Sequence, residues 1–218
     1  MAVKAMTLVG LDVHARQTHA AILDSASGEL RVSRLRMPAI EVAGFLEGLG
    51  PRTLAVYEAG PTGFGLARAA AERGIEVRVV APGSIPTGSG DRVKTDRRDA
   101  IGLVRLLAAG ELCFVFIPTV ADEQFRDLVR AIEDARGDLM RARHRLGKFL
   151  LRRGERYPAA GRAWTQAHLA WLRGLRFEDP CSQAAFIDYP AAVELLTGRR
   201  ATLLVALERQ TRTAATPT

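Results

Sequence analysis

Hydrophobic and polar residues alternate in blocks between positions 6 and 35. Three apolar runs, MTLVGLDV, THAAILD and ELRVSRLRM, are separated by the polar segments HARQ and SASG. Short apolar runs bounded by turn residues are typical of β-strands joined by tight connections. The pattern therefore predicts an antiparallel meander of three strands near the start of the chain.

Helices and strands alternate after residue 38. The segment AIEVAGFLEGL has apolar residues at helical spacing, and TLAVYEAG is apolar enough to form a buried strand. PTGFGLARAAAERG predicts a second helix, and IEVRVVAP predicts a fifth strand. The resulting order, βββαβαβ, resembles that of ribonuclease H-like folds, in which the fourth strand lies beside the first. We therefore expect an α/β domain with a mixed sheet flanked by helices.

A heptad pattern replaces this alternation from Thr119 to Arg153 and predicts one long helix. Its apolar positions are Phe125, Leu128, Ile132, Ala135, Leu139, Ala142, Leu146 and Phe149. A second stretch from Tyr189 to Leu207 has the same spacing, interrupted at Arg200. Two such helices form either an antiparallel hairpin within one chain or a coiled coil between subunits. We expect a homodimer through these helices.

These patterns divide the chain into an α/β domain (1–118), a helical coiled-coil region (119–211) and a short tail (212–218). Within the first part, residues 83 to 94 are rich in Gly, Ser and Pro and have no apolar period. They predict an exposed, mobile loop. Because this loop leads directly into KTDRRDA, it borders the most acidic helix start of the domain.

Four carboxylates fall where such a sheet would gather them. Asp12 ends the first predicted strand, Glu58 ends the fourth, and Asp96 and Asp99 share one face of a helix at spacing i, i+3. Like charges converge at low cost only when a cation neutralises them, and carboxylate oxygens suit Mg²⁺ or Mn²⁺. We predict a catalytic metal site for cutting phosphodiesters. The alternative for the helical pair, acids that favour a helix start capped by Thr95, does not explain the other two.

Charge favours a polyanionic partner, because 31 Lys and Arg outnumber 24 Asp and Glu and give a net charge of +7. Ordinary charge variation in an arginine-rich proteome is the alternative. The most basic stretch spans residues 136–162. Candidate nucleic-acid contacts are Lys94, Arg97, Arg98, Arg141, Arg145, Lys148 and Arg152. The alternative is a solvated helix face for the basic residues between 136 and 162, and simple surface solvation for Lys94, Arg97 and Arg98.

Other side chains are assigned to structure rather than chemistry. His14 follows the first acid closely, and we interpret it as structural. Trp164, His168 and Trp171 are spaced as one helical face and predict an aromatic stripe that packs on the hairpin, in preference to base stacking. Ser84 and Ser89 are interpreted as turn residues.

Cysteine usage and hydropathy bear on location. Cys113 and Cys181 lie far apart without a metal-binding spacing, which indicates two ordinary thiols in a reducing compartment. The N-terminal apolar stretch is too short for a signal peptide, and no run of apolar residues is long enough to span a membrane. We expect a cytosolic protein without a membrane partner.

Five pieces, GLDVH, YEAGPTGFGL, VVAP, KTDRRDA and TQAHLAWL, occur in this order along nearly all of the chain. Together they resemble the DEDD transposases and invertases of the Piv/MooV type, the insertion-sequence 110 class. The resemblance implies a RuvC-like nuclease domain whose four acids hold Mg²⁺ or Mn²⁺. It also implies DNA recombination in bacteria, at the nucleoid, guided by a structured RNA that the element encodes.

The chain departs from this family pattern at its C-terminal end. Members carry a further domain with a serine nucleophile, and no segment here matches it. We therefore expect this chain alone to be incomplete for transposition. A fragment that binds nucleic acid and dimerises without cutting is the main alternative. An actin- or sugar-kinase-like ATPase is disfavoured, because LDVHARQTHAA lacks the Gly-Thr phosphate-binding turn.

Overall fold

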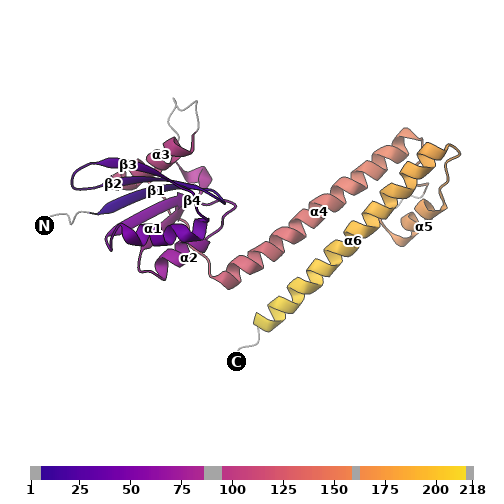
Figure 1. Ribbon diagram of the computed structural model, residues 1–218. Coiled ribbons are helices and arrows are strands. Elements are labelled where there is room, and N and C mark those ends of the chain that lie inside the picture. Colours follow the sequence, from indigo (N-terminus) through magenta and orange to yellow (C-terminus); the bar gives the residue numbers. More distant parts are fainter. Residues whose placement is uncertain (1–5, 86–94, 159–162, 215–218) are drawn as a thin grey trace. The chain divides into compact units, whose positions relative to one another are not determined.

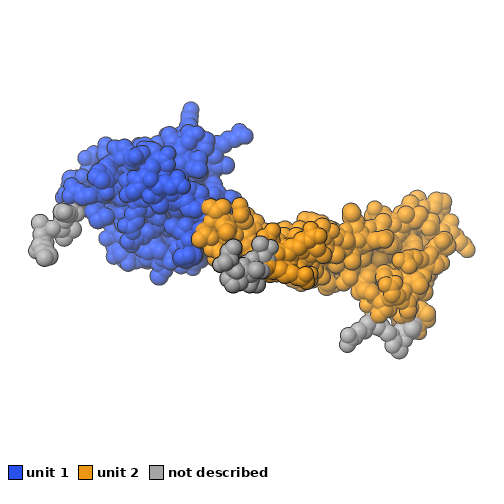
Figure 2. Space-filling view, turned by 90° about the horizontal axis from the view of Figure 1, so that it is seen from below, with its two compact units in different colours: residues 1–118 blue, residues 119–218 orange. Residues whose placement is uncertain are grey.

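The computed structural model describes residues 6–85, 95–158 and 163–214. The first part of the chain is a mixed α/β domain and the second is helical (Figure 1). They form two compact units, residues 1–118 and residues 119–218, shown in blue and orange in Figure 2. Lys94 and the predicted loop from position 86 onward lie outside the described residues.

The described part of the first unit contains a five-stranded sheet in the order β3-β2-β1-β4-β5. The strands are β1 (Thr7–Val13), β2 (Thr18–Asp24), β3 (Leu30–Leu35), β4 (Thr53–Glu58) and β5 (Glu76–Val80). β1 pairs antiparallel with β2 and parallel with β4, while β4 pairs parallel with β5. The predicted meander and the predicted adjacency of the first and fourth strands are confirmed. This mixed sheet with flanking helices is consistent with a ribonuclease H-like fold.

Helices cover both faces of the sheet (Figure 1). On one face lie α1 (Val42–Gly48), preceded by the 3-10 turn η1 (Ala39–Glu41), and α2 (Gly65–Ala71). They bury one set of alternate strand residues, including Val9, Leu11, Ala55 and Tyr57. On the other face α3 (Asp96–Ala109) buries the opposite set, including Leu8, Val56 and Val80. Because side chains alternate along a strand, Gly10, Asp12 and Glu58 belong to the α3 face.

Gly10 lets α3 approach the sheet closely. A Cβ atom at this position would lie 2.2 Å from the Ala100 carbonyl oxygen and 2.6 Å from the Val104 amide nitrogen. Both are backbone atoms of α3, which cannot rotate away as a side chain can. The missing side chain therefore sets the distance between β1 and the helix that carries Asp96 and Asp99.

The second unit contains α4 (Val120–Arg152), α5 (Gln166–Gly174) and α6 (Pro180–Ala214), so α6 extends into the predicted tail. A capping box starts α4: the Thr119 hydroxyl accepts from the Asp122 amide, and the Asp122 carboxylate accepts from the Thr119 amide. α4 and α6 pack along each other within the chain (Figure 1). Their shared core also includes Leu172 of α5. An ion pair between Asp138 of α4 and Arg199 of α6 joins the same two helices.

The heptad positions of α4 separate into two groups. The six from Ile132 to Phe149 are buried, whereas Phe125 is 42% exposed. Packing within one chain therefore accounts for the burial of the later heptad positions of α4. The predicted coiled coil and homodimer stay predictions. The prediction of one helical face for the three aromatic residues is wrong for Trp164, which precedes the Thr165 cap of α5 with a φ of 70°. In the described part of the chain, no helix combines the length and hydrophobicity needed to cross a membrane.

Candidate metal centre

Four structural elements, β1, β2, β4 and α3, bring acids and histidines together at one end of β1. Asp12 lies near the end of β1, and the register that pairs Leu11 with Tyr57 places Glu58 at the corresponding position of β4. The first turn of α3 contributes Asp96 and Asp99. Thr95 caps this helix, since its hydroxyl accepts a hydrogen bond of 3.4 Å from the Arg98 amide. The helix cap and a metal-binding role for the two acids are therefore compatible.

Two histidines lie beside these acids. His19 stands opposite Asp12 in the β1–β2 register, and its Nδ1 atom is 3.5 Å from Asp96 Oδ2. His14 Nε2 is 3.1 Å from Asp12 Oδ2 and 3.7 Å from Asp96 Oδ2. One ligand atom each of Asp12, His19 and Asp96 lies within 4.8 Å of the others. These three residues form the candidate metal centre.

The electrostatics of the centre favour a cation. Burial raises the pKa of the Asp12 carboxyl, and the negative charges of Asp96 and Asp99 raise it further against the lowering effect of His14. His19 Nδ1 is buried and has no hydrogen-bond partner among the described residues. A divalent ion would neutralise the acids and bind His19 Nδ1, which makes no hydrogen bond to a described residue. The two carboxylate oxygens are ligands that both Mn²⁺ and Mg²⁺ accept, and the imidazole nitrogen suits the transition metal Mn²⁺ better than Mg²⁺.

The structure brings together some of the predicted ligands more closely than others. Asp12 and Asp96 belong to the centre, whereas Glu58 and Asp99 are not among the three residues whose ligand atoms converge. Asp99 is nevertheless close enough to act on the Asp12 carboxyl, and Glu58 occupies the neighbouring strand end. His19 was missed from the sequence. The sequence feature that could have identified it is the HARQ turn, whose length pairs position 19 of the second strand with position 12 of the first.

The candidate nucleic-acid contacts are distributed over both units. Arg97 and Arg98 are exposed in the first turn of α3, beside the metal centre. Four more are exposed on α4: Arg141, Arg145, Lys148 and Arg152. Among these, Arg141 is already engaged with Asp138, which lies one helical turn before it. The basic surface of α4 is therefore partly neutralised at that turn.

Replacing Asp12 with asparagine should stabilise the metal-free protein at neutral pH. The pKa of Asp12 is raised above its ordinary value of 3.8 in the folded state, so the folded chain binds more protons than the unfolded chain above that pH. Stability is then lost as pH rises from about 4 through the raised pKa, and the asparagine variant avoids this loss. Thermal unfolding in EDTA should show a higher Tm for the variant at pH 7 and equal Tm values below pH 4. A lower Tm at pH 7 would contradict this prediction.

Comparison with known proteins adds independent information. Residues 9–153 match the model of a transposase family, the DEDD transposases of the IS110 type. The chain is 36% identical over 200 residues to the transposase for insertion sequence element IS1533 of Leptospira borgpetersenii, covering 88% of this chain and 57% of that protein. It is also 50% identical over 129 residues to the putative transposase y4qE of Sinorhizobium fredii, covering 59% of this chain and 33% of that protein. The chain thus spans between a third and about three fifths of the length of these relatives.

Proposed function

Because the chain belongs to the DEDD transposase family of the IS110 type, we propose that its first unit is the metal-binding catalytic domain of a DNA transposase. The observation that carries the proposal is the convergence of Asp12, His19 and Asp96 where β1 ends beneath the start of α3. Among the described residues, the two acids converge on a buried imidazole nitrogen, His19 Nδ1, that makes no hydrogen bond although Asp96 Oδ2 lies 3.5 Å away, and a metal ion would bind all three groups. Breaking a phosphodiester bond in DNA is the reaction class that such a site supports.

The chain's own residues have separate roles in this proposal. Asp12, Asp96 and His19 would hold Mg²⁺ or Mn²⁺, with Glu58 and Asp99 as further ligands when DNA is present. A bound divalent ion would supply positive charge that favours the displacement at phosphorus. His14 orients the Asp12 carboxylate by its hydrogen bond of 3.1 Å. Arg97 and Arg98, exposed beside the acids, would position a phosphate of the substrate.

Nucleic acid is the proposed partner of both units. The net charge of +7 and the exposed basic residues of α4 support binding to a phosphate backbone. A structured RNA encoded by the element is proposed as the guide, from the family resemblance alone.

Dimerisation through the helical unit is proposed as well. Apolar side chains remain exposed at the start of α4 and late in α6, among them Phe125, Val129 and Val205. A second copy could cover them by continuing the heptad seam. Sedimentation over a range of protein concentrations would test this point.

Titration calorimetry with Mn²⁺ and Mg²⁺ tests the metal site directly. We expect saturable binding, weakened at least about tenfold by Asp12→Asn, Asp96→Asn or His19→Gln, because each removes one ligand of a small set. Glu72→Gln, which changes an exposed acid of the same unit, is the matched control and should bind as the wild type does. Glu58→Gln and Asp99→Asn report whether the other two acids contribute. Equal affinity in the control and in all three ligand variants would exclude this site.

Cleavage distinguishes the catalytic domain from a binding fragment. Labelled DNA duplexes and branched junctions, incubated with the chain and Mn²⁺, should be nicked at a rate that Asp12→Asn abolishes. Binding of the same DNA without any metal-dependent nicking would favour the non-catalytic alternative.

A further inference from the structure

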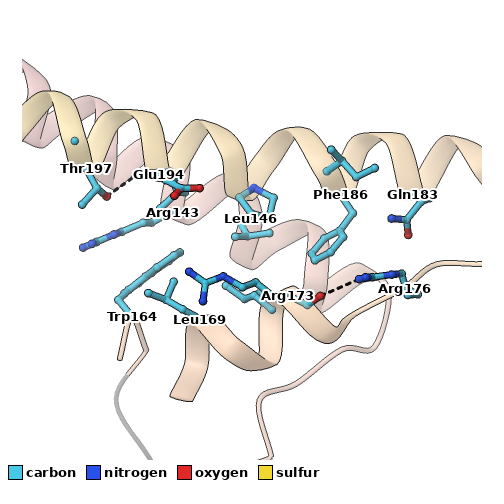
Figure 3. A pocket seen from close by; sticks show the side chains of 15 residues that line it. Arg143, Leu146, Trp164, Leu169, Arg173, Arg176, Gln183, Phe186, Glu194 and Thr197 are labelled. Carbon is cyan, nitrogen blue, oxygen red and sulfur yellow. Dashed lines mark hydrogen bonds between the residues drawn. The ribbon is translucent and has the colours of Figure 1, made fainter. Parts of the chain in front are cut away.

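The helical unit contains a pocket of about 760 Å³ between α4, α5 and α6 (Figure 3). Leu146, Leu169 and Phe186 contribute apolar walls, and Arg143, Arg173 and Arg176 contribute cationic groups. The volume lies within the range of small-molecule sites, roughly 300–1,000 Å³. With one acid, Glu194, against three arginines, the lining is basic as well as apolar. A ligand that fits this chemistry has a flat apolar part and a negative charge.

Trp164 gives the pocket an aromatic wall, and its backbone has an unusual conformation. Its φ of 70° lies in the left-handed region, which a bulky residue adopts only when its surroundings enforce it. The Arg143 guanidinium lies over the Trp164 ring, 4.6 Å from its centroid, and both side chains line the pocket (Figure 3). The Arg143 Nε atom is buried without a hydrogen-bond partner among the described residues. Trp164 and Arg143 thus form a stacked pair, and the Arg143 Nε donor makes no hydrogen bond to any described residue.

We propose that this pocket binds one unstacked base of a single-stranded nucleic acid, with the adjoining phosphates held by Arg173 and Arg176. A base has the flat shape that aromatic rings and guanidinium planes accept, and it has acceptor atoms for an unsatisfied N–H donor. Arg173 and Arg176 are exposed at the pocket, where a backbone that remains in solvent would pass. A duplex keeps its bases stacked, so it does not fill the pocket. The proposal rests on the proposed function for the class of ligand only, and it requires neither a metal nor cleavage.

Intrinsic fluorescence offers a direct readout, because Trp164 lines the pocket and the chain has one other tryptophan, Trp171. Each of their rings contacts the His168 ring, with centroids 5.4 and 5.5 Å apart. Trp171→Phe leaves Trp164 as the reporter. We would titrate the full chain carrying this substitution, in EDTA, with oligo-dT, oligo-U, a duplex, and an abasic oligonucleotide that keeps the phosphates and lacks the bases. EDTA removes any contribution of the metal centre, so failure of the two proposals can be told apart.

A base-dependent site predicts saturable quenching of Trp164 by oligo-dT or oligo-U, and weak quenching by the duplex and the abasic strand. Comparison of the two polymers shows whether DNA or RNA is the preferred source of the base. Trp164→Leu should weaken oligonucleotide binding about tenfold, measured by anisotropy of a labelled strand, because a stacking surface is lost. Its circular dichroism should match that of the wild type.

A second pair of variants tests whether binding depends on the arginines of the pocket or on net charge alone. Arg173→Ala with Arg176→Ala should weaken binding about tenfold, whereas Arg130→Ala with Arg136→Ala, which removes the same charge from exposed positions of α4 outside the pocket, should change it less than about twofold. Quenching that is absent for both polymers, or equal for the abasic strand, would overturn the proposal. Equal losses in the two double variants would also overturn it, since binding would then depend on net charge alone.

Discussion

Replacing Gly10 with alanine should cost about 3 kcal/mol of folding stability and weaken metal binding in the same variant, which is a large effect for one methyl group. The added Cβ atom would lie 2.2 Å and 2.6 Å from two backbone atoms of α3, far inside van der Waals distance. Neither atom can move without the helix. We therefore expect α3 to shift away from β1, carrying Asp96 and its neighbours away from Asp12.

A second glycine of the same site region provides the control. Gly102 lies within α3, and a Cβ atom there would meet nothing within 4 Å. Gly102→Ala should therefore stabilise the protein by roughly 0.5–1 kcal/mol, as expected for alanine in a helix, and leave metal affinity unchanged. Denaturant unfolding and Mn²⁺ titration of both variants measure the two effects. If Gly10→Ala kept wild-type stability and affinity, close packing of α3 on β1 would not be what positions the centre.

The pattern of strands in the sequence predicts those features of the candidate site that depend only on the order of the strands. Alternation and turn residues place Asp12 at the end of the first strand, and the strand order places Glu58 beside it. The approach of α3 is different, because a single glycine in LVGLDVH signals nothing about which helix will pack against it. The position of His19 is partly predictable from the sequence. Its pairing follows from the length of the turn, but the distance to Asp96 depends on how α3 packs.

The helical unit shows where sequence periodicity is insufficient. Heptad spacing identifies the buried residues of α4 but not the partner that buries them, since a hairpin and a dimer need the same pattern. Spacing of four and three also suggested one helix face for Trp164 and His168. The Thr165 hydroxyl, which accepts a hydrogen bond of 3.3 Å from the His168 amide, instead starts α5 after Trp164. A capping residue therefore overrides an apparent period at the helix end.

The largest loss of stability in the second unit is expected for Phe149→Ala. Phe149 is 4% exposed, and its ring lies 5.3 Å from those of Phe177 and Tyr189 and 6.3 Å from that of Phe186, measured between centroids. Removing it leaves a cavity where α4 packs against α6 and the segment after α5. The expected loss is about 3 to 5 kcal/mol, the range measured when a buried phenylalanine is truncated.

Phe125→Ala is the matched control, because the same substitution in the same helix removes a ring that is 42% exposed. At low protein concentration it should cost less than about 1 kcal/mol, since little packed surface is lost. Hydrogen exchange of peptides from α4 and α6 measures both variants, and only Phe149→Ala should raise exchange in the two helices together. Similar losses of stability in the two variants would mean that Phe125 at the start of α4 is packed against another protein surface. If the loss for Phe125→Ala grew with protein concentration, that surface would belong to a second copy of the chain.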